Sequence, residues 1–245
     1  MKKIDRQRVI SFLGFCIFVC IIVQVFFGVT YLFRNTDYSR RHIAGLKQEK
    51  VDMVYVGGSA AFVYWQPLKA WNECGYTSYN YATDSIPAES IKAYIEEARK
   101  FQNPELFVVG IRAFQYYSDE PAEQGVRNGT DSMDMTSPSR YKILNEYFRN
   151  REIPEDTDVL SYYLDIAKYH TNVGNLGTSK AWKLIDNDEN VVNKGWEWVD
   201  KYGYLEQPEN FNTDERAELP ENDIRLLKEL LTYCRTEKLN VLFVV

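Results

Sequence analysis

Histidine is almost absent from this sequence of 245 residues, which contains only His42 and His170. Cysteine is also scarce, and two of the four cysteines lie in an apolar segment. No Cys-x-x-Cys pair and no histidine and cysteine cluster with the spacing of metal ligands occurs, so we expect neither a metal site nor a cofactor. Two interpretations of Cys74 and Cys234 remain open, a single disulfide or two buried free thiols.

A cluster of basic residues is missing as well. The net charge is -6, and lysine and arginine are scattered along the chain. A protein that binds the phosphate backbone needs a concentrated positive surface, so nucleic acid is excluded as a partner. A P-loop is excluded because no Gly-Lys-Ser or Gly-Lys-Thr follows the glycines. Hydrophobic residues make up 45% of the chain, enough for the core of one ordinary domain.

One long hydrophobic run is present, at residues 9–33. A helix needs about 20 such residues to cross the hydrocarbon core of a membrane. Its clearly polar side chains are few: Ser11, Gln24, Thr30 and Tyr31. A buried helix of a soluble protein is the alternative, but such helices are seldom apolar on every face. Because residues 25–31 are bulky, unlike a signal-peptide cleavage site, the run predicts an uncleaved signal anchor.

Basic residues flank this run on both sides. Four precede it, at positions 2, 3, 6 and 8, and three follow it, at positions 34, 40 and 41. The positive-inside rule places the N-terminus in the cytoplasm, although the second group weakens the bias. We therefore expect a cytoplasmic tail at 1–8, a single-pass anchor in the cell membrane, a stalk at 34–50 and one extracytoplasmic domain at 51–245.

Short β-rich runs alternate with helical patterns in the polar part of the chain. Strands are expected at 51–56, 77–80, 106–109 and 239–245, and helices at 88–101 and after Pro220. This alternation predicts an α/β fold with a parallel, flavodoxin-like sheet and helices on both faces. A polar insert rich in tyrosine and tryptophan occupies 116–218, with helices expected at 139–151 and 156–170.

Candidate site residues follow the first three predicted strands, because ligands of open parallel sheets bind outside the carboxyl ends of the strands. Ser59 lies between two glycines and two alanines, which lets the chain turn tightly and a substrate approach closely. It is either a nucleophile, with the N–H of Ala60 holding an oxyanion, or only a turn and helix cap.

Two further polar residues are candidates with structural alternatives. Arg112 ends a buried strand, where a guanidinium binds a ligand or forms a salt bridge with a nearby acid. A serine nucleophile needs a base, and His170 is the candidate, although a histidine at a helix end is often only a favourable cation.

These motifs, at residues 51–59, 78–82 and 106–112, resemble those of the SGNH/GDSL-type hydrolases. The anchored layout is similar to the bacterial envelope branch, which includes D-alanyl lipoteichoic acid transfer proteins and alginate O-acetyltransferases. The resemblance covers residues 51–245 and is strongest in the first sixty of them. It implies a parallel SGNH sheet and a serine nucleophile that acts on acyl groups.

The resemblance also assigns roles to individual residues. Ser59 takes the place of the catalytic serine, with Gly58 where many members have aspartate. Asn80 matches the asparagine of the second motif, and Ser85 matches its oxyanion glycine through the backbone N–H. The Gly-x-Asn motif corresponds to the tripeptide ending at Arg112, which would replace the asparagine. The Asp-x-x-His motif is absent, so we expect the sequence to stop before its catalytic histidine.

Two functions are compatible with these observations. One is an extracytoplasmic serine esterase or acyltransferase acting on envelope glycans or lipid-linked polymers, with a membrane acyltransferase as a candidate partner. The other is a non-catalytic anchored module that binds polysaccharide or a partner protein. The module would use the same cleft or the aromatic residues of the insert, namely Trp182, Trp196 and Trp198. Tryptophans are, however, more often simply part of a core.

Overall fold

The computed structural model describes residues 6–33, 45–47, 49–114, 123–177, 192–198 and 219–245. Within it the chain forms two compact units. Unit 1 comprises Met1–Asn35 and Asp158–Leu184, and unit 2 comprises Thr36–Thr157 and Ile185–Val245. The insert expected from the sequence is therefore divided between the units.

Unit 1 contains the N-terminal helix α1, Arg6–Phe33. Its span Gln7–Phe26 has a mean hydropathy of 2.8, and none of it is buried. About 20 apolar residues suffice to cross a membrane, so α1 is long and apolar enough to do so, as predicted. A signal sequence has the same length and composition, and the orientation of the chain stays a prediction.

The rest of the described part of unit 1 contains a series of short helical segments. They are α8 (Leu160–Tyr163), α9 (Asp165–Tyr169) and the 3-10 segment η2 (His170–Gly177). Helical structure was expected at 156–170 and is present there, but as two short helices, because Leu164 has extended backbone angles, φ -117 and ψ 107. Asp165 then begins a new helix, where an acidic side chain favours the N-terminus.

Unit 2 is built on a sheet of four parallel strands, β1 (Met53–Gly57), β2 (Ser78–Ala82), β3 (Leu106–Gly110) and β4 (Val241–Val244). Their order is β2-β1-β3-β4, and Val54 lies opposite Tyr79 on one side and Phe107 on the other. The parallel α/β fold is confirmed, and the order agrees with a flavodoxin-like sheet over these strands.

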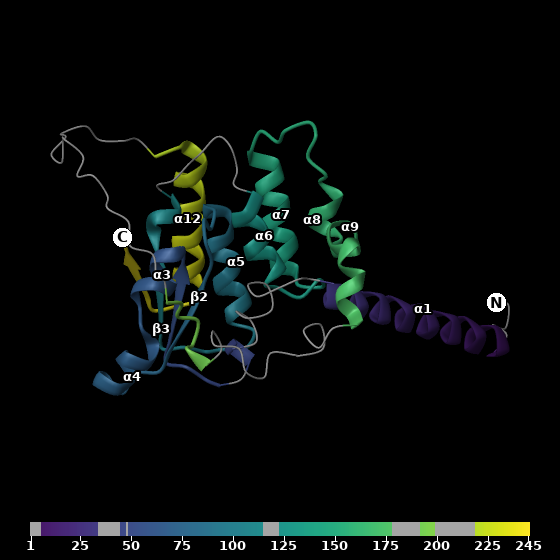
Figure 1. Cartoon of the computed structure of the whole chain (residues 1–245), viewed down its shortest axis with the longest axis horizontal. Coiled ribbons are helices and arrows are strands. Elements are labelled where there is room, and N and C mark those ends of the chain that lie inside the picture. Colours follow the sequence, from purple (N-terminus) through teal and green to yellow (C-terminus); the bar gives the residue numbers. More distant parts are fainter. Residues whose placement is uncertain (1–5, 34–44, 48, 115–122, 178–191, 199–218) are drawn as a thin grey trace. The chain divides into compact units, whose positions relative to one another are not determined.

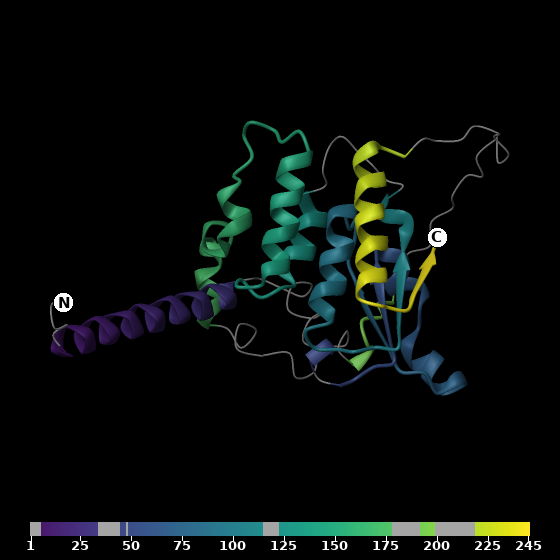
Figure 2. The ribbon, with the colours of Figure 1, turned by 180° about the vertical axis from the view of Figure 1, so that it is seen from behind.

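Helices cover both faces of the sheet, as predicted (Figures 1 and 2). Val54 and Val56 point to the main core, which they share with helices α5 (Ala88–Ala98) and α12 (Glu221–Thr236). Tyr55 points to the opposite face, because side chains alternate along a strand. There it packs against a smaller cluster that includes Phe62 of helix α3 (Ser59–Tyr64).

Four further elements complete the description of unit 2. They are α4 (Pro67–Cys74), η1 (Ile111–Phe114), α6 (Glu123–Asp131) and α7 (Pro138–Asn150). Helix α7 packs against α5 and corresponds to the helix expected at 139–151. Helices α4 and α6 were not predicted, because α4 buries only Pro67 and α6 contains two glycines.

The described part of the predicted stalk, residues 45–47 and 49–50, packs onto unit 2. Leu46 is 1% exposed and belongs to the main core. The Gln102 side chain donates a hydrogen bond of 2.7 Å to the carbonyl oxygen of Glu49. Cys74 and Cys234 are both free, so of the two interpretations the disulfide is wrong, and the thiol of Cys234 is buried whereas that of Cys74 is exposed.

Candidate functional site

A pocket of about 410 Å³ opens at the carboxyl ends of the first three strands. Gly57, at the end of β1, pairs with Ala82 at the end of β2, so the residues that follow these strands meet at one edge. The pocket brings together four residues predicted from the sequence: Ser59, Ala60, Ser85 and Arg112.

Ser59 begins helix α3 immediately after the turn that follows β1. Gly58 caps the helix with extended angles, φ -87 and ψ -161, and no side chain caps it. The N–H of Ala61 donates to the carbonyl oxygen of Gly58 at 2.9 Å. The Ser59 side chain is exposed in the pocket and has no hydrogen-bond partner among the described residues. Its hydroxyl is therefore not committed to the turn or to a helix cap.

Ser85 contributes the second wall of the pocket from an unusual backbone conformation. Its φ is 50, in the left-handed region that costs a residue with a side chain about 1–2 kcal/mol. Gly125 of α6 lies directly against it, and a Cβ at position 125 would be 2.0 Å from the Ser85 carbonyl oxygen. Helix α6 thus fixes a strained loop at the site, and such strain is often found where function requires a defined backbone.

The Gly125→Ala variant is expected to lose about 1–3 kcal/mol of unfolding free energy, because the added methyl group collides with backbone that cannot move cheaply. Thermal unfolding of the full chain measures this loss. Gly174→Ala is the matched control, since a Cβ there meets nothing within 4 Å. Equal stability of the two variants would contradict the close packing of Gly125 on Ser85.

Arg151 is a pocket residue that the sequence reasoning missed. It follows the end of α7, and its side chain is 6% exposed. It forms a bidentate pair with Glu89 of α5, with Nε 2.8 Å from Oε1 and a terminal nitrogen 3.1 Å from Oε2. The guanidinium also lies 5.3 Å from the ring centre of Tyr147. Together with Arg112, it gives the pocket a second guanidinium.

A second carboxylate, that of Asp223 in the first turn of α12, belongs to the same buried cluster. Asp223 is 1% exposed, and neither of its carboxylate oxygens has a hydrogen-bond partner. Burial and repulsion from Glu89, partly offset by attraction to Arg151, raise the pKa of Asp223 from 3.8 to about 6. Two carboxylates therefore share one guanidinium beside the pocket.

The Asp223→Asn variant is expected to be more stable than the wild type at about pH 8, by about 1–2 kcal/mol. Because the folded-state pKa is raised, the stability that the proton contributes is lost as pH rises through about 6. The advantage of the variant should therefore shrink by about 1 kcal/mol at about pH 5. Chemical unfolding at the two pH values measures both differences. An advantage that does not change with pH would contradict the raised pKa.

The two other predicted site residues lie elsewhere. Asn80 is fully buried in β2, and its side-chain nitrogen donates to the carbonyl oxygen of Trp65 at 2.9 Å. It does not line the pocket. His170 belongs to unit 1, whereas the pocket belongs to unit 2, and its Nδ1 lies 3.1 Å from the carbonyl oxygen of Ala167. His42 lies outside the described residues.

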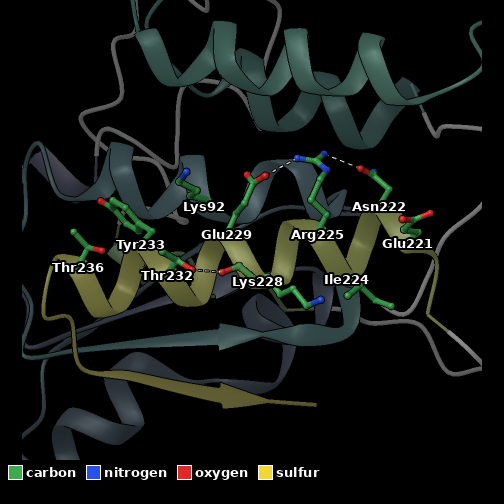
Figure 3. Close-up of a pocket in the computed structure, with 10 residues that line it drawn as sticks. All are labelled: Lys92, Glu221, Asn222, Ile224, Arg225, Lys228, Glu229, Thr232, Tyr233 and Thr236. Atoms are coloured by element: carbon green, nitrogen blue, oxygen red, sulfur yellow. Dashed lines mark hydrogen bonds and ion pairs between the residues drawn. The ribbon is translucent and has the colours of Figure 1, made fainter.

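A larger groove of about 990 Å³ runs along α12, but its chemistry is less suited to catalysis (Figure 3). Arg225 points between Glu229 and Asn222 and bonds to each at 2.7 Å. The hydroxyl of Thr232 donates to the carbonyl oxygen of Lys228 at 2.8 Å. The guanidinium of Arg225 and the hydroxyl of Thr232 are thus bonded to their neighbours, although Asn222 Nδ2 has no hydrogen-bond partner in the described part of the chain. The smaller pocket instead presents an exposed serine hydroxyl next to the ends of the strands.

The glycine turn, the exposed Ser59, the strained loop at Ser85 and two arginines therefore line one pocket, and one of these arginines, Arg151, is paired with Glu89. In the described residues, no group of three or more histidine, cysteine or acidic side chains is placed to hold a metal ion. Comparison with known proteins does not extend this picture: no family model matches the sequence, and no curated protein matches it.

Proposed function

We propose that this protein is an extracytoplasmic, membrane-anchored serine esterase or acyltransferase that acts on acyl groups of bacterial cell-envelope glycans. The observation that carries the proposal is the Ser59 side chain, which is exposed in the pocket at the carboxyl ends of the strands and has no hydrogen-bond partner among the described residues. A free hydroxyl on a tight strand-to-helix turn is the position that a nucleophile requires.

In this mechanism, Ser59 Oγ attacks the carbonyl carbon of the acyl donor and loses its proton to a base. The N–H groups of Ala60 and Ser85 and the guanidinium of Arg112 stabilise the oxyanion. The donor oxygen leaves with a proton, and the acyl group stays on Ser59. A hydroxyl of the acceptor glycan, or water, then attacks the ester and frees the serine. His170, the base expected from the sequence, lies in unit 1, and loss of Ser59 labelling in a His170→Ala variant would assign it this role.

Helix α1 supports the proposed location at the outer surface of the membrane. We propose that it is an uncleaved anchor with the N-terminus in the cytoplasm. Residues 34–44 join it to the part of the chain that packs onto unit 2, and their extended length spans at most about 40 Å. The site therefore reaches only membrane-proximal acceptors, such as wall glycans and lipid-linked polymers, and a membrane acyltransferase is a suitable source of acyl groups.

The alternative is a non-catalytic anchored module that uses the same pocket for binding. It is favoured by one observation: the described part of unit 2 contains no histidine that could serve Ser59 as a base. Its other proposed surface includes Trp182, which lies outside the described residues.

Reaction of the full chain with a fluorophosphonate probe separates the two functions. The enzyme forms a stable adduct that mass spectrometry maps to Ser59, because the probe reacts with activated serines. A binding module gives no adduct above that of a denatured sample. Lack of labelling at neutral pH, in protein shown to be folded by circular dichroism, would overturn the enzymatic proposal.

A further inference from the structure

Five of the exposed large aromatic or apolar side chains of unit 2 lie on α3, on α4 and on the segments next to them, outside the pockets described above. Four come from the end of α3, from α4 and from the turn after it, and the fifth follows a short helical turn near residue 192. They are Tyr64 (80% exposed), Leu68 (47%), Trp71 (58%), Tyr76 (46%) and Trp198 (67%). We call this surface the aromatic edge.

Helix α4 presents its side chains to solvent to an unusual degree, since Pro67 is its only buried residue. It projects from the end of the sheet in both views of the ribbon (Figures 1 and 2). Its two charges, Lys69 and Glu73, lie within 4.0 Å of each other. The helix thus offers Leu68 and Trp71 with little net charge beside them.

Trp198 is held next to the last turn of α3. The backbone N–H of Glu197 donates to the carbonyl oxygen of Phe62 at 3.0 Å. The indole N–H of Trp196 donates to the carbonyl oxygen of Val63 at 3.0 Å, and its ring centre lies 5.9 Å from that of Trp198. These contacts place Trp198 on the same side of unit 2 as Tyr64.

The aromatic edge lies at the amino end of the sheet, where the chain from α1 also enters unit 2. Helix α3 starts at the carboxyl end of β1 and leads back, so α4 lies near the beginning of β2. Just before β1, the Asp52 carboxylate accepts hydrogen bonds from the N–H and hydroxyl of Thr77, at 2.9 and 2.7 Å. Lys194, near Trp198, pairs with Glu49 at 2.5 Å. The segment at residues 49–52, through which the chain reaches β1, therefore lies beside the aromatic edge.

We propose that the aromatic edge contacts the lipid headgroup region of the membrane that α1 spans. Tryptophan and tyrosine favour this region because their rings are apolar and their N–H or O–H groups reach water. The segment that precedes β1 and follows α1 in the chain reaches the sheet at this end. A glycan site is less suited to a projecting helix, since sugar and ligand sites are mostly concave. This proposal does not depend on the chemistry of Ser59.

Contact between the aromatic edge and the membrane determines the direction in which the candidate active site faces. The pocket lies at the carboxyl ends of the strands, and five residues of β1 separate it from the aromatic edge. At about 3.3 Å per residue, the pocket is about 17 Å farther from the bilayer. It then opens away from the lipid surface, toward the polymer outside the membrane.

Tryptophan quenching by brominated phosphatidylcholine, with the full chain in nanodiscs, tests this contact. The lipid is expected to quench the wild type, and the Trp71→Phe/Trp198→Phe variant should lose most of that quenching. Trp65→Phe is the matched control, because the Trp65 indole is half-buried and donates to Ser78 Oγ at 2.9 Å. Added salt should leave the quenching unchanged, since the nearby charges are paired.

Acrylamide quenching of the wild type tests the same contact without any substitution, so a variant that folds poorly does not affect it. In the wild type, the acrylamide-accessible fraction of the fluorescence should be smaller in nanodiscs than in a lipid-free amphipol. Quenching by brominated lipid that survives the double substitution, or equal acrylamide accessibility in both media, would overturn the proposal. Protection by a soluble envelope glycan in amphipol, without lipid quenching, would instead assign the edge to sugar. A negative result in these quenching experiments does not change the outcome expected for fluorophosphonate labelling of Ser59.

Discussion

The Glu89→Gln variant is expected to lose about 3 kcal/mol of unfolding free energy at about pH 8, because it removes the charge of the buried bidentate pair between Glu89 and Arg151. Removing one member of a buried pair costs about 3–5 kcal/mol in general, and the nearby charge of Asp223 offsets part of that loss. For a chain of this length, the melting temperature should fall by about 6–12 °C. Unfolding followed by tryptophan fluorescence measures the change.

The buried cluster of Glu89, Asp223 and Arg151 also predicts that Asp223→Asn has opposite effects on stability in two backgrounds. In the wild type, Asp223→Asn removes a carboxylate that competes with Glu89 for Arg151, so the substitution stabilises the fold. In the Glu89→Gln background, Asp223 is the remaining negative charge of the described cluster beside Arg151, so the same substitution destabilises it. A double-mutant cycle measures this coupling. Two additive effects would show that the three side chains do not act as one cluster.

Glu96→Gln is the control for these measurements, on the same helix. Glu96 pairs with Lys142, whose side chain is 61% exposed, so the pair is screened by solvent. Its loss should cost less than about 1 kcal/mol. A cost as large as that of Glu89→Gln would mean that the burial of the Glu89 pair is unimportant.

The fold was largely predictable because its strands are short β-rich runs and the α5 helix has a clear periodic pattern. Ile91, Ile95 and Ala98 were expected on one face of a helix, and each is fully buried. The end of that helix was less certain, and α5 stops at Ala98 instead of Phe101. Helix α4 could not be predicted, since its exposed Leu68 and Trp71 face solvent and give no signal of a buried side.

The candidate site was predictable in one part and not in another. Ser59, Ser85 and Arg112 each follow a strand, and the topology of a parallel sheet brings such residues to one edge. Glu89 and Asp223 instead lie in the first turns of α5 and α12, where an acidic residue commonly just favours the helix N-terminus. Only the packing of these helices against the end of α7 reveals their shared partner.

Ser59→Ala is expected to abolish fluorophosphonate labelling of the full chain, because it removes the oxygen that attacks the probe. The substitution should change the unfolding free energy by less than about 0.5 kcal/mol, since the side chain is exposed and unbonded within the described structure. Loss of labelling with unchanged stability therefore reports on chemistry and not on folding. Labelling rate, peptide mapping and thermal unfolding of the same samples provide the measurement.

Ser85→Ala separates the nucleophile from the second serine of the pocket. The proposed role of Ser85 is its backbone N–H, which alanine retains, so labelling at Ser59 should continue. An adduct that moves to Ser85, or persists in Ser59→Ala, would assign the reactive oxygen to another residue. If both variants are unlabelled, the Ser85 hydroxyl takes part in activating Ser59. Labelling that depends on Ser59 and survives Ser85→Ala would assign the reactive oxygen to Ser59 and limit Ser85 to its backbone N–H.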